Sequence, residues 1–492
     1  MTATPSPIAA ARLFRGQALF RGQALFRGQA LFRGQVLSGT CPAVFSGLSR
    51  DSRQVTRGQA YVAQSLVPNE RVQHGAQARA AGAIVIAAEA PAELLTPHPR
   101  WAFARASAAL HELDEHCLPL LATTGTKGKS TITQIAWWLL GAGAARTGTI
   151  GWHDGVRETP NRQTTPPADE LHAFLKALPA NCPGVALEVS SHGADQYRLA
   201  GLSLAALAVT GIGHDHLDYH GSHSAYVAAK LRAVQLLRRG GRLVINADDG
   251  HAHLFAHAGA CVGAEVIMLS AAEVAADGLG SPLPGAFNAW NTAAAVRLVE
   301  VVGVTRATAQ ARLASMPAIP GRLELLAQAP LTYVDYAHTA ESIAAVITAL
   351  RAAHHGAPLA IVFGCGGDRD PSKRAPMGAA ASAADVVVIT TDNSRSEDPQ
   401  AIATAILRGV AAAGTHLVEP DRARAIVRAR AAVGPAGVVV VAGKGHETTQ
   451  DIHGVITHWD DRAFVRSLAP SAILLQQDQQ QDQQQDQPRV QP

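Results

Sequence analysis

The sequence is poor in lysine. Of its 42 basic residues only six are lysines, so arginine serves nearly everywhere that a generic positive charge is needed. Lysine carries a compact amine that can lose its proton, whereas the guanidinium of arginine stays charged. The lysines that remain are therefore candidates for chemistry that arginine cannot do. One of them, Lys176, lies outside the motifs described below, and the other five lie inside them: Lys127, Lys129, Lys230, Lys373 and Lys444.

Other features are missing as well, and each absence excludes a class of protein. There is no run of about 18 or more apolar residues, which excludes a transmembrane helix. The five cysteines show no C-x-x-C spacing, so they indicate neither a zinc framework nor a disulfide scaffold, and they suit a reducing cytosol. A net charge of only +3 gives no argument for a nucleic-acid partner. We expect a cytoplasmic, monomeric protein that acts on small molecules.

Both ends of the chain are repetitive. A six-residue unit, L-F-R-G-Q-A, recurs in nearly identical copies from Leu13 to Gln35. Its period is too short for a solenoid, and its regularly spaced arginines, without an apolar core segment, argue against a signal peptide. Residues 476–492 consist mainly of glutamine and aspartate. We predict that residues 1–38 and 476–492 are low-complexity and disordered.

The length of 492 residues suits roughly three domains, which we place at residues 39–115, 116–322 and 323–475. In each, apolar strands alternate with helical stretches, which predicts an α/β fold with mostly parallel sheets and helices on both faces. The first domain should contain the strands Ala60–Ala63 and Ala83–Ala87 with a helix near His74–Ala81. The strands expected in the other two are Leu120–Thr123, Gly184–Glu188, Ala206–Thr210, Arg242–Asn246, Leu331–Asp335, Leu359–Phe363, Val386–Thr391 and Gly437–Ala442.

Residues 121–140 predict a phosphate-binding loop. They read as the end of a buried strand, a tight turn with Gly125 and Gly128, and an amphipathic helix. The N–H groups of such a turn and of the helix N-terminus favour an anion. Lys129 would reach the outer phosphates, and the Ser130 hydroxyl would face Mg²⁺. The loop is two residues shorter between its glycines than the general pattern, and a glycine-rich turn with an exposed lysine is the alternative.

A carboxylate and three histidines follow later strands of the central domain. Glu188 ends a strand, where it can hold Mg²⁺ directly or through water, although a solvated turn is the alternative. His214, His216 and His220 have a spacing that could support zinc, but neither a cysteine nor an H-E-x-x-H motif accompanies them. We favour a single histidine with Glu188 around a nucleotide-bound Mg²⁺.

Three further residues of this domain stand out. Lys230 ends an alanine-rich helical stretch, where it either does lysine-specific work or is a cation favoured by the helix dipole. Asn288 and Asn291 lie three residues apart on one face of a helix, so both amides can contact one planar ligand edge. Helix capping by Asn288 is the alternative.

Four polar loops follow strands of the third domain, at residues 335–339, 364–373, 392–398 and 443–447. Ligands of parallel α/β sheets bind at the carboxyl ends of strands. Arg369 and Arg395 suit a carboxylate, and Asp392 with Glu447 suits an ammonium group. An amino acid with charged ends fits this set, and surface charges on solvated loops are the alternative.

Taken together, the motifs resemble those of the Mur ligases that add the third residue of the peptidoglycan peptide. Between Asp51 and Leu468 they read, in order, G-T-K-G-K-S, L-E-V-S-S-H-G, D-H-L-D-Y-H-G with A-Y-V-A-A-K, F-N-A-W-N, P-G-R, D-Y-A-H-T, F-G-C-G-G-D-R-D, D-N-S-R and A-G-K-G-H-E. The resemblance implies a small N-terminal UDP-sugar-binding α/β domain, a central P-loop ATPase-like domain and a C-terminal Rossmann-like domain that binds the amino acid.

The resemblance also implies an amide-forming ligase that uses ATP and Mg²⁺. It would add meso-2,6-diaminopimelate to UDP-MurNAc-L-Ala-D-Glu through an acyl phosphate, by positioning and charge neutralisation. Implied ATP contacts are Gly125, Thr126, Lys127, Gly128, Lys129, Ser130, Thr131, Asn288, Asn291, Arg322, Asp335 and His338. Implied metal ligands are Ser130, Glu188, His216 and Lys230 as a carbamate, and Lys129, Glu188, His216 and Lys230 would be catalytic.

For the other two substrates the resemblance implies one set of residues each. The UDP-substrate would be held by Ser52, Thr164, Thr165, Ser190, Gln196 and Arg198. Diaminopimelate would be held by Arg369, Asp392, Asn393, Arg395, Gly443 and Glu447. Arg395 would favour diaminopimelate over lysine, because it can pair with the second carboxylate.

The chain departs from the family pattern at several positions. Lys127 stands where the family has Asn, Gly211 and His214 differ from the usual residues, and D-N-S-R replaces D-N-P-R. Residues 64–71 replace a G-x-x-x-D-G segment that helps to bind the nucleotide sugar. Two alternatives therefore remain: a paralogous ligase with another acceptor or amino acid, and a nucleotide-binding homologue without turnover.

Overall fold

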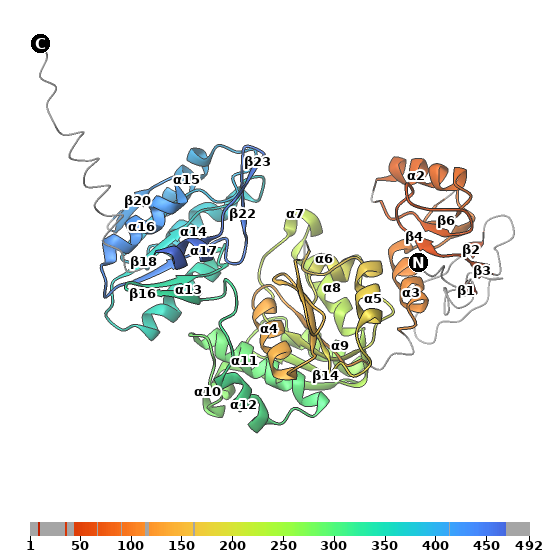
Figure 1. The fold of residues 1–492 in the computed structure, drawn as a ribbon, viewed down its shortest axis with the longest axis horizontal. Coiled ribbons are helices and arrows are strands. Elements are labelled where there is room, and N and C mark those ends of the chain that lie inside the picture. Colours follow the sequence, from red (N-terminus) through yellow and green to blue (C-terminus); the bar gives the residue numbers. More distant parts are fainter. Residues whose placement is uncertain are drawn as a thin grey trace, which may run out of the picture. The chain divides into compact units, whose positions relative to one another are not determined.

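The computed structural model of the chain describes residues 8–9, 35–36, 44–65, 67–89, 91–113, 118–160, 163–412 and 414–468. Nearly all of the predicted N-terminal repeat and the whole predicted C-terminal tail lie outside these residues. The chain divides into two compact units, residues 1–280 with 290–316 and residues 281–289 with 317–492 (Figure 1).

The first unit begins with a five-stranded sheet. Its strand order is β2 (Gln35–Val36), β7 (Leu94–Leu95), β6 (Ile84–Ala87), β5 (Ala60–Val62) and β4 (Leu48–Ser49), and only the β2–β7 pair is antiparallel. The helices α2 (Pro68–Ala80) and α3 (Pro99–Leu110) each start at a proline, whose fixed φ suits the first helical position. The short strands β1 (Ile8–Ala9) and β3 (Val44–Phe45) pair with each other.

An eight-stranded sheet forms the larger part of the first unit. Its order is β11 (Glu158–Thr159), β10 (Gly151–His153), β9 (Ala145–Gly148), β12 (Val185–Glu188), β8 (Leu120–Thr124), β13 (Leu204–Val209), β14 (Leu237–Asn246) and β15 (Glu265–Leu269). The strands from β9 to β15 in this order pair in parallel. The pairs β9–β10 and β10–β11 are antiparallel. The accompanying helices are α4 (Lys129–Leu140), α5 (Ala168–Ala177), α6 (Ser191–Asp195), α7 (Leu217–His220), α8 (His223–Val234), α9 (Ala252–Cys261), α10 (Ala271–Asp277), α11 (Ala286–Val299), the 3-10 helix η1 (Glu300–Val302) and α12 (Arg306–Ala314).

The central strands of this sheet are apolar on both faces because helices cover both. Every residue of β13, Leu-Ala-Ala-Leu-Ala-Val, is buried. Leu207 and Val209 belong to a core that also contains Leu171 of α5 and Phe255 of α9. Helix α4 packs on β8, β9 and β12. A continuous apolar strand is typical of parallel sheets that are covered on both sides.

The second unit contains a six-stranded sheet in the order β16 (Glu324–Gln328), β17 (Leu331–Val334), β21 (Val438–Val441), β18 (Leu359–Phe363), β19 (Val386–Ile389) and β20 (Thr415–Val418), parallel except for β16. Alternate residues of β21 enter different cores. Val438 and Val440 pack with α13 (Ala340–Ala353), α14 (Arg374–Ala381) and α15 (Pro399–Leu407), while Val439 and Val441 pack with α16 (Arg422–Val433) and α17 (Asp461–Ser467). The 3-10 helix η2 (Pro371–Lys373) and the hairpin β22 (Thr449–Ile452)–β23 (Val455–His458) complete the unit.

The predicted α/β class with parallel sheets is confirmed. Some elements begin or end elsewhere than predicted, and the structure adds strands that the sequence did not predict, among them β9, β15 and β20. Helix α2 begins at Pro68, six residues before the predicted start, because its polar first turn lacks the apolar periodicity that would mark it in the sequence. Strand β14 begins at Leu237, five residues early. The domain boundaries at residues 115, 322 and 475 stay a prediction.

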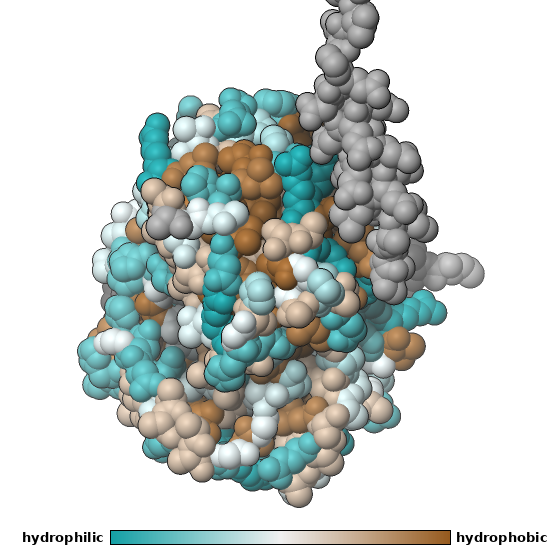
Figure 2. All heavy atoms as spheres, turned by 90° about the vertical axis from the view of Figure 1, so that its left-hand side faces the viewer, coloured by the Kyte–Doolittle hydropathy of each residue, from teal (hydrophilic) through white to brown (hydrophobic). Residues whose placement is uncertain are grey.

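The surface of the protein carries both hydrophilic and hydrophobic side chains (Figure 2). On the face shown in Figure 2, hydrophobic patches alternate with hydrophilic ones. Among the described helices there is none with the length and apolar character needed to cross a membrane.

His172 on α5 is completely buried in the first unit. Within the described parts of the chain, neither of its ring nitrogens has a hydrogen-bond partner. Burial, with a smaller effect of nearby His111, lowers the pKa of His172 from 6.5 to about 3, since removal from water disfavours the imidazolium. The unfolded chain therefore binds this proton more readily than the folded protein does. The lowered pKa of His172 causes no loss of stability above pH 6.5, and stability is lost as the pH falls from 6.5 towards 3.

We predict that His172→Phe weakens the acid sensitivity of the fold. The variant should lose less unfolding free energy than the wild type between about pH 7 and 5, because it removes one protonation that favours the unfolded chain. Urea unfolding followed by circular dichroism at both pH values measures the effect. His253→Gln, at an exposed position, serves as the control and should behave as the wild type. An equal acid-induced loss in His172→Phe and the wild type would contradict this explanation.

Candidate active site

The predicted phosphate loop lies between β8 and α4, at the carboxyl edge of the eight-stranded sheet. Its last residue, Gly128, precedes α4 as the N-cap with φ +81°. The N–H of Thr126 donates to Gly211 O at 2.8 Å, and the Thr210 hydroxyl donates to Lys127 O at 2.6 Å. The loop is therefore bonded to the segment that follows the neighbouring strand β13.

Gly125 is required by this arrangement for two reasons. Its φ of +138° lies in a region that side chains disfavour, and a Cβ atom there would overlap the hydroxyl oxygen of Thr210. The absence of a side chain thus allows the segments after β8 and β13 to approach each other.

Lys129 lies over the loop. Its Nζ donates to the carbonyl oxygens of Gly125 and Thr126, both at 3.1 Å. Ser130 and Thr131 occupy the first turn of α4 and are buried. An anion at the start of α4 would meet the ammonium group and the helix N-terminus together.

Glu188 at the end of β12 connects the loop to a third segment. Its Oε2 accepts hydrogen bonds from Ser130 Oγ at 3.1 Å and Thr149 Oγ1 at 2.9 Å, and its Oε1 accepts from Thr149 N at 3.0 Å. The parallel register places Glu188 opposite Thr123 of β8, directly before the loop. A buried carboxylate beside a hydroxyl is an oxygen donor set of the kind that Mg²⁺ prefers, so the residues present fit this ion.

Lys230 lies inside α8, which continues to Val234, so the prediction that it ends the helix is wrong. It is 1% exposed, and its Nζ donates to Gly125 O at 2.7 Å. Burial and the ammonium group of Lys129 lower the pKa of Lys230 well below that of an ordinary lysine. Both effects favour the neutral, nucleophilic amine over the ammonium form. The alternative interpretation of Lys230 as a cation stabilised by the dipole at a helix end is therefore wrong.

Two residues that the sequence prediction missed support the loop. Tyr226, one turn before Lys230, is hydrogen-bonded through its hydroxyl to Thr126 Oγ1 at 2.8 Å, and its ring centre lies 4.7 Å from Lys230 Nζ. Thr149 contacts Glu188, as described above. The A-Y-V-A-A-K spacing, which puts Tyr226 and Lys230 on one helix face, could have indicated the first.

The three histidines of the central motif do not converge. The His214 ring stacks on His223 with 4.5 Å between centroids, whereas His216 and His220 pack against His192 at 4.8 and 5.6 Å. In the described ranges, no group of three or more His, Cys, Asp or Glu side chains is arranged to hold a metal ion. The zinc alternative therefore has no structural support. Burial lowers the pKa of His216. It also lowers the pKa of His192, to about 4.

The predicted acceptor-binding residues of the central domain lie around α6. Thr165 donates to Glu188 O at 2.8 Å and accepts from Ser190 N at 2.9 Å, while Thr164 is bonded to Thr149 at 2.9 Å. Gln196 Oε1 accepts from Arg198 Nη2 at 2.8 Å. Arg198 also donates to Thr165 O. Four of the predicted residues are therefore within two hydrogen bonds of Glu188: Thr164, Thr165, Ser190 and Arg198. Ser52 is buried in the five-stranded domain, where it donates to Gln77 at 2.9 Å.

Asn288 and Asn291 both lie on α11 and are buried. Asn288 Nδ2 donates to Pro284 O at 2.8 Å, and α11 begins at Ala286, so Asn288 is not the capping residue. The Asn291 amide lies close to Gly128 of the phosphate loop, since a Cβ atom on that glycine would be 2.6 Å from Asn291 Oδ1.

In the second unit, three motifs that are far apart in the sequence meet. A side chain at Gly321, where φ is +63°, would overlap the backbone of Gly445 and His446. The guanidinium of Arg322 lies 4.6 Å from the ring centre of Tyr336, which also contacts His446. The motifs P-G-R, D-Y-A-H-T and A-G-K-G-H-E therefore form one surface.

The two predicted ATP contacts in D-Y-A-H-T have backbone partners. Asp335 accepts from the N–H groups of Leu323 and Ala337, both at 2.8 Å, and His338 Nδ1 lies 2.7 Å from Tyr336 O. Burial raises the pKa of Asp335 despite the nearby Arg322 guanidinium and these two N–H donors.

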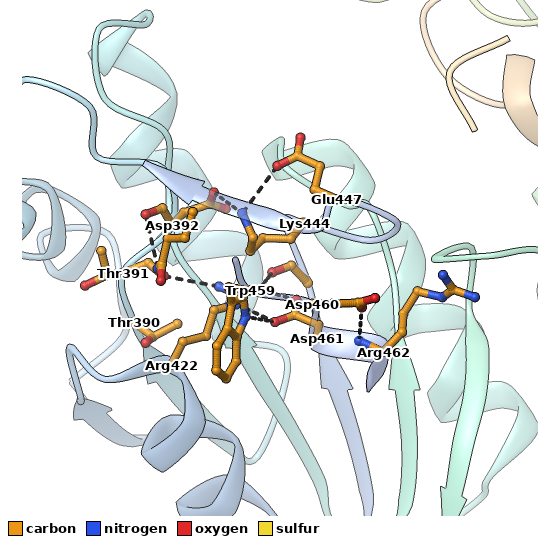
Figure 3. Close-up of polar contacts among 12 residues, drawn as sticks. Thr390, Thr391, Asp392, Arg422, Lys444, Glu447, Trp459, Asp460, Asp461 and Arg462 are labelled. Atoms are coloured by element: carbon orange, nitrogen blue, oxygen red, sulfur yellow. Dashed lines mark hydrogen bonds and ion pairs between the residues drawn. The ribbon is translucent and has the colours of Figure 1, made fainter. Parts of the chain in front are cut away.

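Beside that surface, the acidic residues predicted to bind an ammonium group surround Lys444 (Figure 3). Lys444 is completely buried, and its Nζ lies 3.3 Å from Glu447 Oε2 and 3.9 Å from Asp392 Oδ1. It also donates to Asn393 Oδ1 at 3.2 Å, and Asn393 Nδ2 donates to Glu447 at 3.0 Å. Gly443 lies against the Asp392 carboxylate. The sequence prediction left Lys444 out of the site, although the scarcity of lysine had marked it.

The two arginines predicted to bind carboxylates lie on neighbouring loops. Arg369 is exposed, and Arg395 has φ +51° and donates through Nη1 to Gly367 O, within the loop after β18. The N–H of Arg395 donates to Asp451 O at 3.1 Å, which joins its loop to the β22–β23 hairpin. Positive and negative groups thus line the carboxyl ends of neighbouring strands.

Comparison with known proteins identifies the family. Residues 123–280 match the Mur ligase middle domain, and residues 321–445 match the Mur ligase glutamate ligase domain. A UDP-N-acetylmuramoyl-L-alanyl-D-glutamate–2,6-diaminopimelate ligase of Chlorobaculum tepidum is 36% identical over 465 residues, covering 85% of this chain and 91% of that protein. The chain belongs to the Mur ligase family. It is accordingly an ATP-dependent, amide-forming ligase.

Further relatives of this Mur ligase agree. A protein of the same name from Brucella melitensis is 37% identical over 463 residues, covering 85% of this chain and 93% of that protein. A solved structure of a ligase of that name is 30% identical, with a TM-score of 0.64 over 94% of this chain and 98% of that one. The Thermotoga maritima MurF ligase, solved with ADP, is 16% identical and shares the fold with a TM-score of 0.53, over 80% of this chain and 93% of that one.

We predict that Gly125→Ala destroys the phosphate loop of this Mur ligase. The added methyl group would displace Thr210, break its bond to Lys127 O and strain the backbone, so ATP affinity should fall at least about tenfold. Calorimetric titration with ATP measures the effect. Gly240→Ala is the matched control, because Gly240 also has positive φ (+73°) but no atom lies within 4 Å of the added carbon. Unchanged ATP affinity in Gly125→Ala would contradict the assigned role of this turn.

Proposed function

We propose that this Mur ligase adds meso-2,6-diaminopimelate to UDP-MurNAc-L-Ala-D-Glu in peptidoglycan precursor synthesis. One observation carries the proposal: the named diaminopimelate ligases match this chain at 36–37% identity over 85% of its length. The phosphate loop with buried Glu188 and Lys230, and the charged strand-end loops of the second unit, supply the groups that such a reaction needs.

The reaction couples ATP cleavage to amide formation. The side-chain carboxylate of the D-glutamyl residue attacks the γ-phosphorus of ATP, and ADP leaves, which gives an acyl phosphate. The neutral amine of diaminopimelate then attacks the acyl carbon, and phosphate leaves from a tetrahedral intermediate. Because both steps join anions or develop negative charge, the protein contributes chiefly positioning and charge neutralisation.

In the first unit, Lys129 and the backbone of residues 125–131 hold the phosphates of ATP. Ser130 and Glu188 would hold Mg²⁺, with His216 and Lys230 as the further predicted ligands. When bound, the ion neutralises phosphate charge and fixes the phosphoryl group for in-line attack. Thr164, Thr165, Ser190, Gln196 and Arg198 orient the acceptor beside Glu188.

In the second unit, Asp392 and Glu447 pair with an ammonium group of diaminopimelate, and Arg369 and Arg395 pair with its carboxylates. Planar guanidinium groups suit carboxylates because two parallel hydrogen bonds can form. The second carboxylate of diaminopimelate distinguishes it from lysine, and Arg395 is the residue assigned to it. This assignment is supported by the bonds of Arg395 to Gly367 O and Asp451 O, since the Asp451 N–H in turn donates to Asn393.

We predict that the purified protein releases phosphate from ATP only when UDP-MurNAc-L-Ala-D-Glu and diaminopimelate are both present. Phosphate release and mass spectrometry of the product measure the reaction, with L-lysine and UDP-MurNAc-L-Ala as matched controls. Turnover only with another acceptor or amino acid would contradict the proposal and indicate a paralogous ligase. No turnover with any acceptor would leave a nucleotide-binding homologue.

We further predict that Lys230 acts as a carbamate, formed when its neutral amine adds to carbon dioxide. The support is its complete burial, its lowered pKa and its contact with Gly125 O. Lys230→Arg should abolish phosphate release, since a guanidinium cannot form the carbamate. Lys230→Ala should be inactive and be rescued in part by millimolar acetate or another short carboxylate.

The control for this rescue is Lys176→Ala, at an exposed lysine outside the motifs, which should keep full activity without added carboxylate. Full activity of Lys230→Arg would rule the carbamate out.

A further inference from the structure

A buried ion pair lies beneath the charged loops of the second unit. Arg422, the first residue of α16, contacts Asp461, the first residue of α17, through two parallel bonds of 2.7 Å, Nε to Oδ1 and Nη2 to Oδ2 (Figure 3). Arg422 is 3% exposed and Asp461 is completely buried. Trp459 Nε1 donates to Asp461 Oδ1 at 2.7 Å and fixes the carboxylate further.

The remaining donors of Arg422 point at two backbone carbonyls. Nη2 donates to Ala442 O at 2.9 Å, and Nη1 donates to Thr391 O at 3.4 Å. These carbonyls belong to the residues directly before Gly443 and Asp392. One rigid, planar group therefore joins the turns that carry Asp392 and Glu447, which we call the acidic cluster. Gln450 Nε2 adds a second bond to Thr391 O at 3.1 Å.

Stability alone is a poor reason for such a pair. Taking two charges out of water costs several kcal/mol per ion in real proteins, and well-packed apolar residues often replace a buried pair without loss. The pair contributes geometry instead. A guanidinium held by a carboxylate can fix the spacing of the loops after β19 and β21, two strands that do not pair with each other.

Arg422 also affects the ionisation of the Asp392 carboxyl group. The groups that face Asp392 are Arg422 of α16, Lys444 after β21, His338 after β17, and, as neutral groups, Tyr336 and Cys365. Burial alone would raise the pKa of Asp392, but Arg422 and then Lys444 hold it below the usual value. Asp392 is therefore an ionised carboxylate in spite of its burial.

We propose that the Arg422–Asp461 pair is the positioning element of the amino-acid subsite. It sets the distance between the turn at Asp392 and the turn at Gly443, and it keeps Asp392 ionised for an ammonium ligand. Arg422 and Asp461 touch no substrate, so they act through Asp392, Lys444 and Glu447. This role rests on the proposed function, because it takes diaminopimelate to be the molecule that those residues bind.

The test compares three variants in the full-length enzyme. Arg422→Lys keeps the charge but loses the two-pronged geometry, and the double variant Arg422→Gln/Asp461→Asn removes both charges without leaving one buried alone. Arg430→Lys is the matched control, since Arg430 lies on the same helix and also donates to backbone carbonyls, those of Ala329 and Pro330 at the opposite end of the sheet. Steady-state phosphate release gives the kinetic constants for each substrate.

We expect KM for diaminopimelate to rise about tenfold or more in Arg422→Lys and in the double variant, with KM for ATP and for the UDP-substrate within about twofold of the wild type. In the double variant the pKa of Asp392 rises, so the acid limb of kcat/KM for diaminopimelate should move up by about half a pH unit or more. Arg430→Lys should change none of these. Constants that match those of Arg430→Lys would overturn the proposal.

Amide hydrogen exchange provides a readout that does not depend on activity. Exchange at residues 391–395 and 442–447 should speed up in Arg422→Lys but not in Arg430→Lys, and equal exchange in the two variants would overturn the positioning role. If the wild type shows no diaminopimelate-dependent turnover, the proposed function fails, and this comparison still decides whether the pair fixes the two turns.

Discussion

The parallel pairing of β12, β8 and β13 is the constraint on which the first unit depends. It brings three strand ends to one edge of the sheet, so that Glu188, the phosphate loop and Thr210 follow neighbouring strands. Parallel sheets place ligand sites at this edge because the loops there leave the sheet side by side. The absent side chain of Gly125 then allows the loops after β8 and β13 to join through hydrogen bonds. Lys230 of α8 and Glu188 of β12 then contact this loop and the first turn of α4.

Both units place a buried basic side chain beneath a loop at the carboxyl edge of a sheet. In the first, the Lys230 amine donates to Gly125 O of the phosphate loop. In the second, Arg422 donates to Ala442 O and Thr391 O under the acidic cluster. The difference between the two residues follows from their chemistry. A lysine in a dry site can lose its proton and react, whereas an arginine keeps its charge and its planar geometry.

These sites give up local stability for function. Buried Lys444, Arg422 and Asp461 require desolvation, and only nearly complete hydrogen bonding offsets that cost. The glycines at positive φ and the left-handed backbone of Arg395 add strain. Such features belong where a ligand must be held, whereas the rest of each sheet is a regular apolar core that can support them.

The sequence by itself determined the α/β class, the central strands and the family. Those strands are continuous apolar runs, and the phosphate loop is recognised from the spacing of its glycines and lysine in the sequence. Only the tertiary structure decided which residues share a site. The pairing of Arg422 with Asp461, the contact of Tyr226 with Thr126 and the separation of His214 from His216 all depend on contacts between segments, which periodicity does not encode. The start of α2 was missed because its polar first turn lacks apolar periodicity, and the end of α8 was missed because tertiary packing rather than local pattern sets where a helix stops.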